Sequence, residues 1–214
     1  MACKFPGFVT GVLSEAALIP AQLPVRCSGA DSAGARIQAL SLADSGCDLL
    51  ISFGLAGGLD PALPSGTLLV PAEIIAPDGR RYASAPKVTS LFKNACTGPI
   101  AGSDKIVSTP ALKAALFERT HATAVDMESH AVAEVAEQRG LPFLALRALA
   151  DGSDMCLPPF IAQAVTPEGH TRLGPILMGL LRQPASLPDL LKLALSSRKA
   201  FASLKRALPL LKTE

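Results

Sequence analysis

Three segments of this 214-residue chain place reactive or very small residues directly after apolar runs. Ser28-Gly29 pairs a hydroxyl with a bare backbone, which suits the approach of an oxyanion or a sugar oxygen. The run Gly54-Leu55-Ala56-Gly57-Gly58 offers backbone amides at close range, and Asp151 adds a carboxylate between Ala150 and Gly152. Each segment also has an ordinary interpretation, because glycines after a strand commonly form a turn and an aspartate there commonly caps a helix.

The elements that must position these segments alternate between strand and helix patterns. Apolar runs predict strands at 8–12, 25–28, 48–53, 67–70, 73–75 and 143–148, and helices at 33–45 and 127–138. The run 48–53 is expected to stop at the glycine cluster, and Gly140 is the expected C-cap of the second helix. Ile37, Leu40 and Ala43 are the expected buried positions of the first helix.

This alternation predicts an α/β fold with a mostly parallel central sheet flanked by helices, followed by a helical C-terminal extension. In such sheets ligands bind beyond the carboxyl ends of the strands, where the three segments lie. Residues 29–34 do not fit the G-x-G-x-x-G dinucleotide fingerprint, which argues against a Rossmann dehydrogenase.

Composition narrows the protein class. Hydrophobic residues make up 49% of the chain, enough for a substantial core without tryptophan. No apolar run approaches ~18 residues and the N-terminus makes a poor signal peptide, so we expect a cytoplasmic protein. The five cysteines are scattered without C-x-x-C spacing, which argues against a zinc site or a disulfide framework: Cys3, Cys27, Cys47, Cys96 and Cys156.

The C-terminal region differs from the rest in charge and texture. Residues 1–169 carry 12 Lys and Arg against 16 Asp and Glu, whereas residues 170–214 carry 8 against 2. We expect a catalytic domain over 1–156 and a helical, Leu-rich basic extension over 157–214. The extension either docks on the enzyme body or lies in a membrane interface with its basic side toward anionic headgroups. Its expected apolar stripe is Leu187, Leu190, Leu191, Ala194, Phe201, Leu204 and Leu208.

Four segments, in order over about residues 8–155, resemble motifs of one enzyme superfamily. The run 54–59 with 64–71, and the runs 101–107, 125–131 and 141–151, resemble those of purine nucleoside phosphorylases and methylthioadenosine/S-adenosylhomocysteine nucleosidases. The segment 10–15 and the leucine-rich run 187–194 resemble the hopanoid-associated phosphorylases, a subfamily that releases adenine from adenosylhopane.

The resemblance implies cleavage of a purine N-glycosidic bond and assigns roles to residues. Asp151 is the implied general acid at purine N7, with a pKa raised by apolar surroundings. Glu128 is expected to accept hydrogen bonds from the ribose hydroxyls, and Glu15 is the candidate for activating water. Other implied contacts are Met127 with the sugar, Ile106 and Val107 with the base, Ala56 and Gly57 with the ligand, and Ser28 and Gly29 with phosphate or another nucleophile.

Some of these residues have structural alternatives. Met127 alone is an ordinary core residue, Glu128 alone suits the first turn of a helix, and a buried His130 needs no ligand. Arg147 is expected to pair with nearby carboxylates.

Departures from the motifs leave the nucleophile open between water and phosphate. Ala150 stands where the family usually has serine, which removes a hydroxyl that would orient Asp151. Leu55 replaces a hydroxyl residue, and Ser52 stands where the phosphorylases carry arginine. Glu15 lies one position short of the nucleosidase glutamate.

Three functions are therefore weighed. The first is an enzyme that releases adenine from adenosylhopane, and the second is a soluble methylthioadenosine or S-adenosylhomocysteine nucleosidase or a purine nucleoside phosphorylase. The third is a peripheral lipid-binding protein without catalysis. We expect no cofactor, metal or nucleic acid, and leave open a phosphate co-substrate, a homodimer and a peripheral position at the inner membrane.

Overall fold

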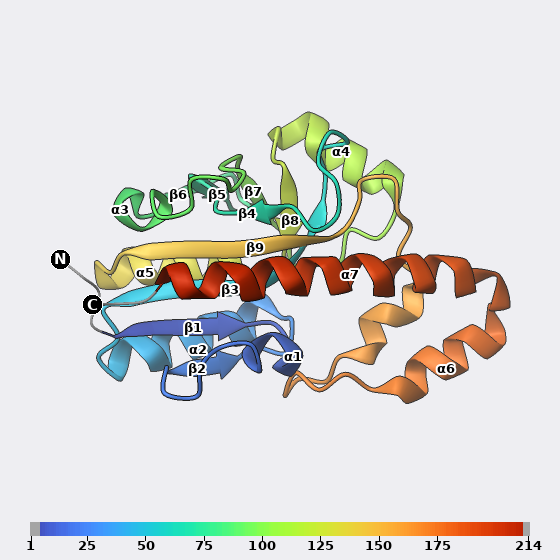
Figure 1. Ribbon diagram of the computed structural model, residues 1–214, viewed down its shortest axis with the longest axis horizontal. Coiled ribbons are helices and arrows are strands. Elements are labelled where there is room, and N and C mark those ends of the chain that lie inside the picture. Colours follow the sequence, from blue (N-terminus) through green and yellow to red (C-terminus); the bar gives the residue numbers. More distant parts are fainter. Residues whose placement is uncertain (1–4, 212–214) are drawn as a thin grey trace.

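The computed structural model describes residues 5–211, apart from the side chains of residues 162 and 163, and contains a nine-stranded sheet with helices on both faces (Figure 1). The strands are β1 (Pro6–Thr10), β2 (Val25–Cys27), β3 (Leu49–Gly58), β4 (Leu68–Leu69), β5 (Glu73–Ile75), β6 (Arg81–Ala83), β7 (Ile100–Gly102), β8 (Ala124–Asp126) and β9 (Phe143–Asp151). The α-helices are α1 (Leu13–Ala16), α2 (Ser32–Asp44), α3 (Pro86–Thr89), α4 (Pro110–Thr120), α5 (Ser129–Arg139), α6 (Leu173–Arg182) and α7 (Leu187–Ala207). Short 3-10 turns cover Pro159–Ala164, Pro184–Ser186 and Leu208–Leu211.

The sheet is mostly parallel, as the sequence predicts. Strands β2, β1, β3 and β9 run parallel, with Phe8 opposite Ile51 and Ile51 opposite Leu144. The glycine end of β3 turns to pair antiparallel with β8, where Gly57 lies opposite Val125. Strands β8, β7 and β5 continue in parallel, and the short strands β4 and β6 pair antiparallel with β9 and β5.

Alternating residues of the central strands pack into two apolar layers. Phe8 and Ile51 face one layer, which α7 closes with Ala200 and Leu204. Their neighbours face the other layer, formed against α2 and α5 from residues that include Val9, Leu50, Ala35, Ala39, Val132 and Val135. Figure 1 shows α7 crossing one face of the sheet while α2 and α5 cover the other.

The buried face of α2 differs from the prediction. Ile37 is 63% exposed, whereas Ala35, Ala39 and Leu42 are completely buried. The two alanines allow the helix axis to approach β1 and α5 closely, so the small residues and not Ile37 define the packed face.

Strand β3 continues through the glycine cluster, so the predicted stop at Phe53 is wrong. A Cβ atom on Gly54 would lie 2.5 Å from the Glu15 carboxylate, and one on Gly58 would lie 2.8 Å from the Asp151 carbonyl oxygen. The glycines thus allow neighbouring groups to pack directly against an extended strand.

Other boundaries also shift. Helix α5 begins at Ser129 rather than at Met127, and Gly140 ends it in the left-handed conformation with φ 64°, as predicted. Of the motif segment 101–107, only the first two residues belong to a strand, β7, and neither β7 nor α4 was among the predicted elements.

The predicted apolar stripe of the C-terminal helix is split between two sides of α7. Leu204 is buried in the core and Phe201 is half-buried, but Leu187 and Leu191 are exposed. The buried side instead uses small residues at helical spacing, namely Ser196, Ala200, Ser203 and Ala207. No helix in the described part of the chain is both long and apolar enough to cross a bilayer.

Candidate active site

A cavity of about 210 Å³ lies at the carboxyl ends of β1, β3, β8 and β9. It brings together most of the residues that the sequence singles out, although they come from distant parts of the chain. These are Glu15, Ala56, Gly57, Ile106, Val107, Met127, Glu128 and Asp151.

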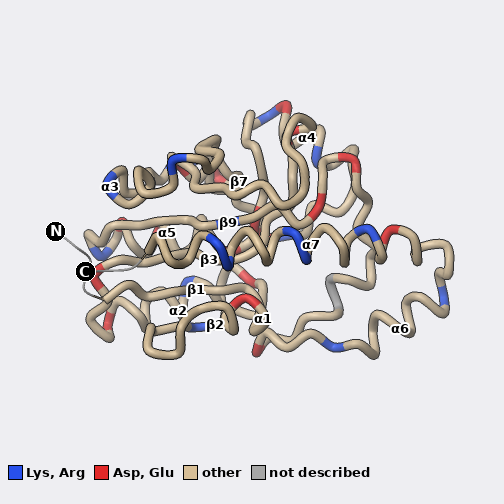
Figure 2. The backbone as a smooth tube through the Cα atoms, viewed as in Figure 1, with Lys and Arg blue, Asp and Glu red and all other residues tan. Residues whose placement is uncertain are grey.

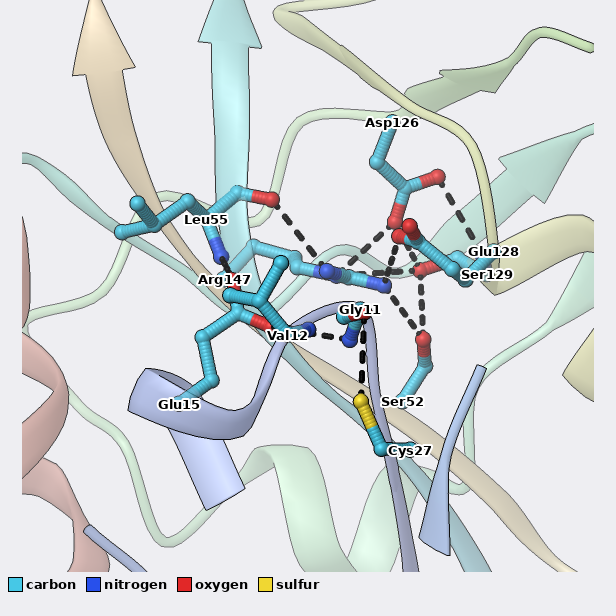
Figure 3. Close-up of polar contacts among 10 residues, drawn as sticks. All are labelled: Gly11, Val12, Glu15, Cys27, Ser52, Leu55, Asp126, Glu128, Ser129 and Arg147. Carbon is cyan, nitrogen blue, oxygen red and sulfur yellow. Dashed lines mark hydrogen bonds and ion pairs between the residues drawn. The ribbon is translucent and has the colours of Figure 1, made fainter. Parts of the chain in front are cut away.

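Arg147 is the centre of the polar network behind this cavity (Figure 3). Its side chain is 1% exposed, and its Nε lies 2.8 Å from Asp126 Oδ2 while Nη2 lies 3.0 Å from Glu128 Oε2. Nη2 also donates to Ser52 Oγ at 2.6 Å, and Nη1 donates to the Leu55 carbonyl at 3.2 Å. The expected pairing of Arg147 with local carboxylates is confirmed.

Two serine hydroxyls complete this network. Ser129 Oγ donates to the Asp126 carboxylate and lies 3.1 Å from Ser52 Oγ. Ser52 stands where the phosphorylases are expected to carry arginine, and here its hydroxyl oxygen accepts a hydrogen bond from Arg147. Its position therefore adds no positive charge to the site.

Backbone amides hold Glu15 in place. Its Oε2 accepts hydrogen bonds from the amides of Gly11 at 2.8 Å and Val12 at 3.1 Å, and its Oε1 accepts one from Leu55 at 2.8 Å. A Cβ atom on Gly11 would lie 2.9 Å from Glu128 Oε1 and 3.4 Å from Glu15 Oε2, so two carboxylates flank this glycine. Burial raises the pKa of Glu15, although Arg147 and the three amides act to lower it.

Glu128 precedes α5 and makes no capping hydrogen bond, so the interpretation of a first-turn residue is wrong. Its carboxylate pairs with Arg147 instead. Burial raises the pKa of Glu128 to about 7; Arg147 opposes this rise, whereas Asp126 and Glu15 add to it.

Asp151 ends β9, and its carboxylate forms an ion pair with Lys113 of α4. A Cβ atom on Gly57 would lie 3.4 Å from Asp151 Oδ2, so the glycine gives the carboxylate room beside β3. Burial raises the pKa of Asp151 although Lys113 lowers it, which is the direction expected from the sequence. Asp151 lies within a strand and does not cap a helix.

Ser28 and Gly29 are not among the residues that line the cavity. Ser28 is buried, and its hydroxyl has no hydrogen-bond partner among the described residues. A Cβ atom on Gly29 would lie 2.3 Å from the Pro167 carbonyl oxygen, so its bare backbone accommodates a chain segment rather than a ligand. The neighbouring Ala30 reaches the cavity instead.

His130 is buried outside the cavity, with Nε2 3.4 Å from Asp104 Oδ1. Three further residues of the site were not predicted from the sequence: Lys113, Asp126 and Leu157. Asp126 directly precedes the Met-Glu pair, and that adjacency was a usable signal. Lys113 and Leu157 carried no local signal.

The raised pKa of Glu128 makes stability depend on pH. The folded state favours the protonated form of Glu128. The contribution of this group to the free energy of unfolding is therefore complete below the ordinary glutamate pKa of 4.5, and it is lost as the pH rises through about 7. We expect Glu128→Gln, which cannot ionise, to lose less free energy of unfolding than the wild type between about pH 5 and pH 8. Denaturant titration at several pH values measures this. Glu137→Gln, an exposed change on the same helix, is the control, and parallel curves for all three proteins would contradict the expectation.

Comparison with known proteins places this site in a family. The family model described as the Phosphorylase superfamily matches residues 8–173. The chain is 30% identical over 132 residues to the 5'-methylthioadenosine/S-adenosylhomocysteine nucleosidase of Geobacillus kaustophilus, covering 49% of this chain and 55% of that protein. It is 26% identical over 149 residues to the enzyme of the same name from Shewanella halifaxensis, covering 58% of this chain and 65% of that protein. The matches thus span between about half and two thirds of these relatives.

Solved structures show the same fold. Futalosine hydrolase of Helicobacter pylori superposes with a TM-score of 0.70 at 18% identity, covering 97% of this chain and 98% of that one. The S-adenosylhomocysteine nucleosidase of Streptococcus pyogenes, in complex with 5-methylthiotubericidin, gives 0.71 at 17% identity, covering 96% of each chain. The family match runs from β1 through the whole cavity into α6, and the chain therefore belongs to the Phosphorylase superfamily.

Proposed function

We propose that this protein hydrolyses the N-glycosidic bond of an adenine nucleoside, with water as the nucleophile. The observation that carries the proposal is the presence of separate acidic groups in one cavity. Glu15 and Glu128 lie beside Gly11, and Asp151 lies beside Gly57. Two carboxyl groups with different surroundings can act as base and acid in the same reaction.

The reaction needs one proton delivered to the departing purine and one proton removed from the attacking water. As the bond from C1' to the base lengthens, its electron pair passes to the purine and the Asp151 carboxyl gives its proton to N7. The oxygen of a water molecule forms the new bond to C1', and Glu15 accepts the proton that this water loses. The raised pKa values of both groups suit these transfers, because burial makes each carboxyl group hold its proton more strongly than an ordinary carboxyl group.

Other cavity residues suit recognition of the nucleoside. Glu128 is placed to accept hydrogen bonds from the ribose hydroxyls, and Met127 beside it offers an apolar contact to the sugar. Ile106 and Val107 give the base an apolar wall. The backbone of Ala56 and Gly57 lies beside the ligand space because these residues have little or no side chain.

The charges of the cavity favour water over phosphate. Its lining contains the carboxyl groups of Glu15, Asp126, Glu128 and Asp151. Arg147 and Lys113 form ion pairs with three of these carboxyl groups, and Lys105 is exposed to solvent. A phosphate dianion would therefore find neither of these two buried cations unpaired, whereas water needs no counter-charge. The hydrolytic names of the relatives point the same way.

The adenine group of the substrate is supported by the relatives, since methylthioadenosine and S-adenosylhomocysteine are both adenine nucleosides. Within that class we propose adenosylhopane, the substrate implied by the resemblance to hopanoid-associated phosphorylases. The alternative is a small soluble nucleoside such as methylthioadenosine, which the names of the curated relatives favour.

Exposed leucines in the C-terminal region support a lipid-linked substrate. Leu173, Leu177 and Leu181 of α6 are spaced four residues apart and are 69%, 60% and 79% exposed. Leu187, Leu191 and Leu195 repeat this pattern on α7. These six residues are called the leucine face below. Figure 1 places α6 beyond the carboxyl ends of the strands, on the side of the molecule where the cavity lies.

Basic residues accompany the leucine face. Arg172 directly precedes α6 and Arg182 is its last residue, and Figure 2 shows further basic positions recurring along α7. Exposed apolar side chains beside cations match an anionic bilayer, which offers both an acyl region and negative headgroups. We propose that the leucine face rests on such a surface and brings the cavity to a substrate held in the bilayer.

Adenine release tests the acid and base roles. Asp151→Asn and Glu15→Gln should each lower kcat/KM for adenine release by roughly two to four orders of magnitude, because each removes a proton-transfer group. Asp154→Asn, an exposed change three residues after Asp151, is the control and should remain near wild type. Activity of Asp151→Asn within about threefold of wild type would remove it from the acid role.

The identity of the sugar product tests the nucleophile. We expect a free sugar hemiacetal at every phosphate concentration, and incorporation of one ¹⁸O atom at C1' when the reaction runs in ¹⁸O-labelled water. A sugar 1-phosphate that forms only when phosphate is present would contradict the hydrolytic mechanism. Parallel assays with adenosylhopane and methylthioadenosine decide between the two substrates.

Vesicle binding tests the leucine face. Since α7 buries Ala200 and Leu204, deleting it would expose the core, and substitutions on the surface are more informative. We expect cosedimentation of the wild type with anionic vesicles at low salt, weakened by high salt. A triple change of Leu173, Leu177 and Leu181 to serine should abolish it, whereas the control triple change of the exposed residues Ile37, Leu91 and Leu112 should not. Binding that survives the first triple change, or is absent in the wild type, would contradict this role.

A further inference from the structure

Lys113 is a completely buried lysine whose ammonium group lies against the proposed catalytic acid. Its side chain is 0% exposed, and its Nζ donates to Asp151 Oδ2, to the Gly152 carbonyl at 2.6 Å and to the Met155 carbonyl at 2.9 Å. An ammonium group has three N–H donors, so these partners use all of them. Moving the ammonium group would leave a buried charge without hydrogen-bond partners, which costs free energy. The contacts therefore hold both the lysine and its partners in position.

These contacts connect three parts of the molecule. Lys113 projects from α4, Asp151 ends β9, and the two carbonyl groups belong to the loop that follows β9. The same loop leads to Leu157, which lines the cavity and donates its amide hydrogen to the Ser108 carbonyl at 2.8 Å. The position of the acid and the shape of this cavity wall therefore depend on one side chain.

The pairing also distinguishes the two oxygens of Asp151. Oδ2 is held by Lys113, whereas Oδ1 has no hydrogen-bond partner among the described residues and belongs to a side chain that lines the cavity. The residue before it is Ala150, whose methyl group offers no hydrogen bond to orient the carboxyl. Lys113 supplies the hydrogen bond that Ala150 does not.

We propose that Lys113 is a positioning residue for Asp151: it holds Oδ2, presents Oδ1 to N7 of the departing base, and balances the carboxylate that forms when the proton has left. This inference rests on the proposed hydrolysis of a nucleoside. The proton passes from Oδ1 to N7, the electron pair of the glycosidic bond goes to the purine, and the ammonium group keeps all of its protons. Solvent returns a proton to Asp151 after the base has departed.

Burial and Lys113 have opposite effects on the pKa of Asp151, and Lys113 is the charged group that opposes burial. Burial raises the pKa of Asp151 and Lys113 lowers it, so removing the ammonium group leaves burial unopposed. The other charged groups near the carboxylate form no ion pair with it in the described chain; they are Glu15 on α1, Lys105, Asp126 on β8, Glu128 before α5 and Asp154 in the following loop.

Substitutions at Lys113 test this role through the pH profile. Lys113→Met should lower kcat by up to about a hundredfold through loss of orientation, and should move the alkaline limb of kcat/KM to higher pH because the acid stays protonated longer. Lys113→Arg keeps the charge and should restore the position of that limb. Lys93→Met, an exposed change, should alter neither property. An unshifted limb in Lys113→Met would overturn the inference.

A double variant separates positioning from general structural damage. In the Asp151→Asn background, Lys113→Met leaves no unpaired buried charge, and it should lower the residual activity by no more than about twofold if Lys113 acts only through Asp151. A further loss of tenfold or more would show that Lys113 acts independently and would overturn the inference.

The carboxyl ¹³C resonance of Asp151, assigned by its absence from Asp151→Asn, provides a readout without turnover. Its titration midpoint should rise in Lys113→Met, and an unchanged midpoint would overturn the inference. If the wild-type protein fails to release adenine from any adenine nucleoside, the proposed function is overturned, even if the titration midpoint of Asp151 shifts as expected.

Discussion

The buried guanidinium of Arg147 is the interaction on which the rest of the site depends. A cation that is 1% exposed is tolerated only with close counter-charges, and Asp126 and Glu128 provide them. The three residues lie on or next to different strands, so satisfying the charge fixes β9 relative to β8 and to the start of α5. Ser52 on β3 and the Leu55 carbonyl extend the same constraint to the strand between them.

Small residues make this arrangement possible. The carboxylates approach the backbone at Gly11, Gly54 and Gly57, where a Cβ atom would lie between 2.5 and 3.4 Å from an acidic oxygen. Packing acids this closely removes water from them, and burial is the leading cause of the raised pKa values of Glu15, Glu128 and Asp151. Ionisation of these buried groups costs stability, but the same burial gives the cavity carboxyl groups that hold a proton more strongly than exposed ones.

The sequence predicted several residues of the candidate site from their positions at the ends of strands. Asp151 could be placed beside the glycine cluster because both follow strands of one parallel sheet, and the Met127-Glu128 pair could be added from the family motif. The same rule predicted Ser28 and Gly29 at the ligand site, whereas the structure places the next residue, Ala30, in the cavity lining and the Pro167 carbonyl against Gly29.

Partners that are distant in sequence could not be predicted. Lys113 lies on the short helix α4, where a lysine is ordinarily solvated, and only the tertiary fold directs it toward Asp151. The buried faces of α2 and α7 were misjudged for a related reason. The prediction favoured large apolar residues such as Ile37, whereas these helices approach the sheet closely and use alanine and serine there.

A crystal structure of Asp151→Asn bound to an intact adenine nucleoside would test the central claim most directly, because this variant should bind substrate but cleave it very slowly. We expect N7 of the base within hydrogen-bond distance of residue 151, the ribose hydroxyls on Glu128, and an ordered water between Glu15 and C1'. A nucleoside bound with its sugar turned away from Glu128, or with no room for water between Glu15 and C1', would contradict hydrolysis at this site.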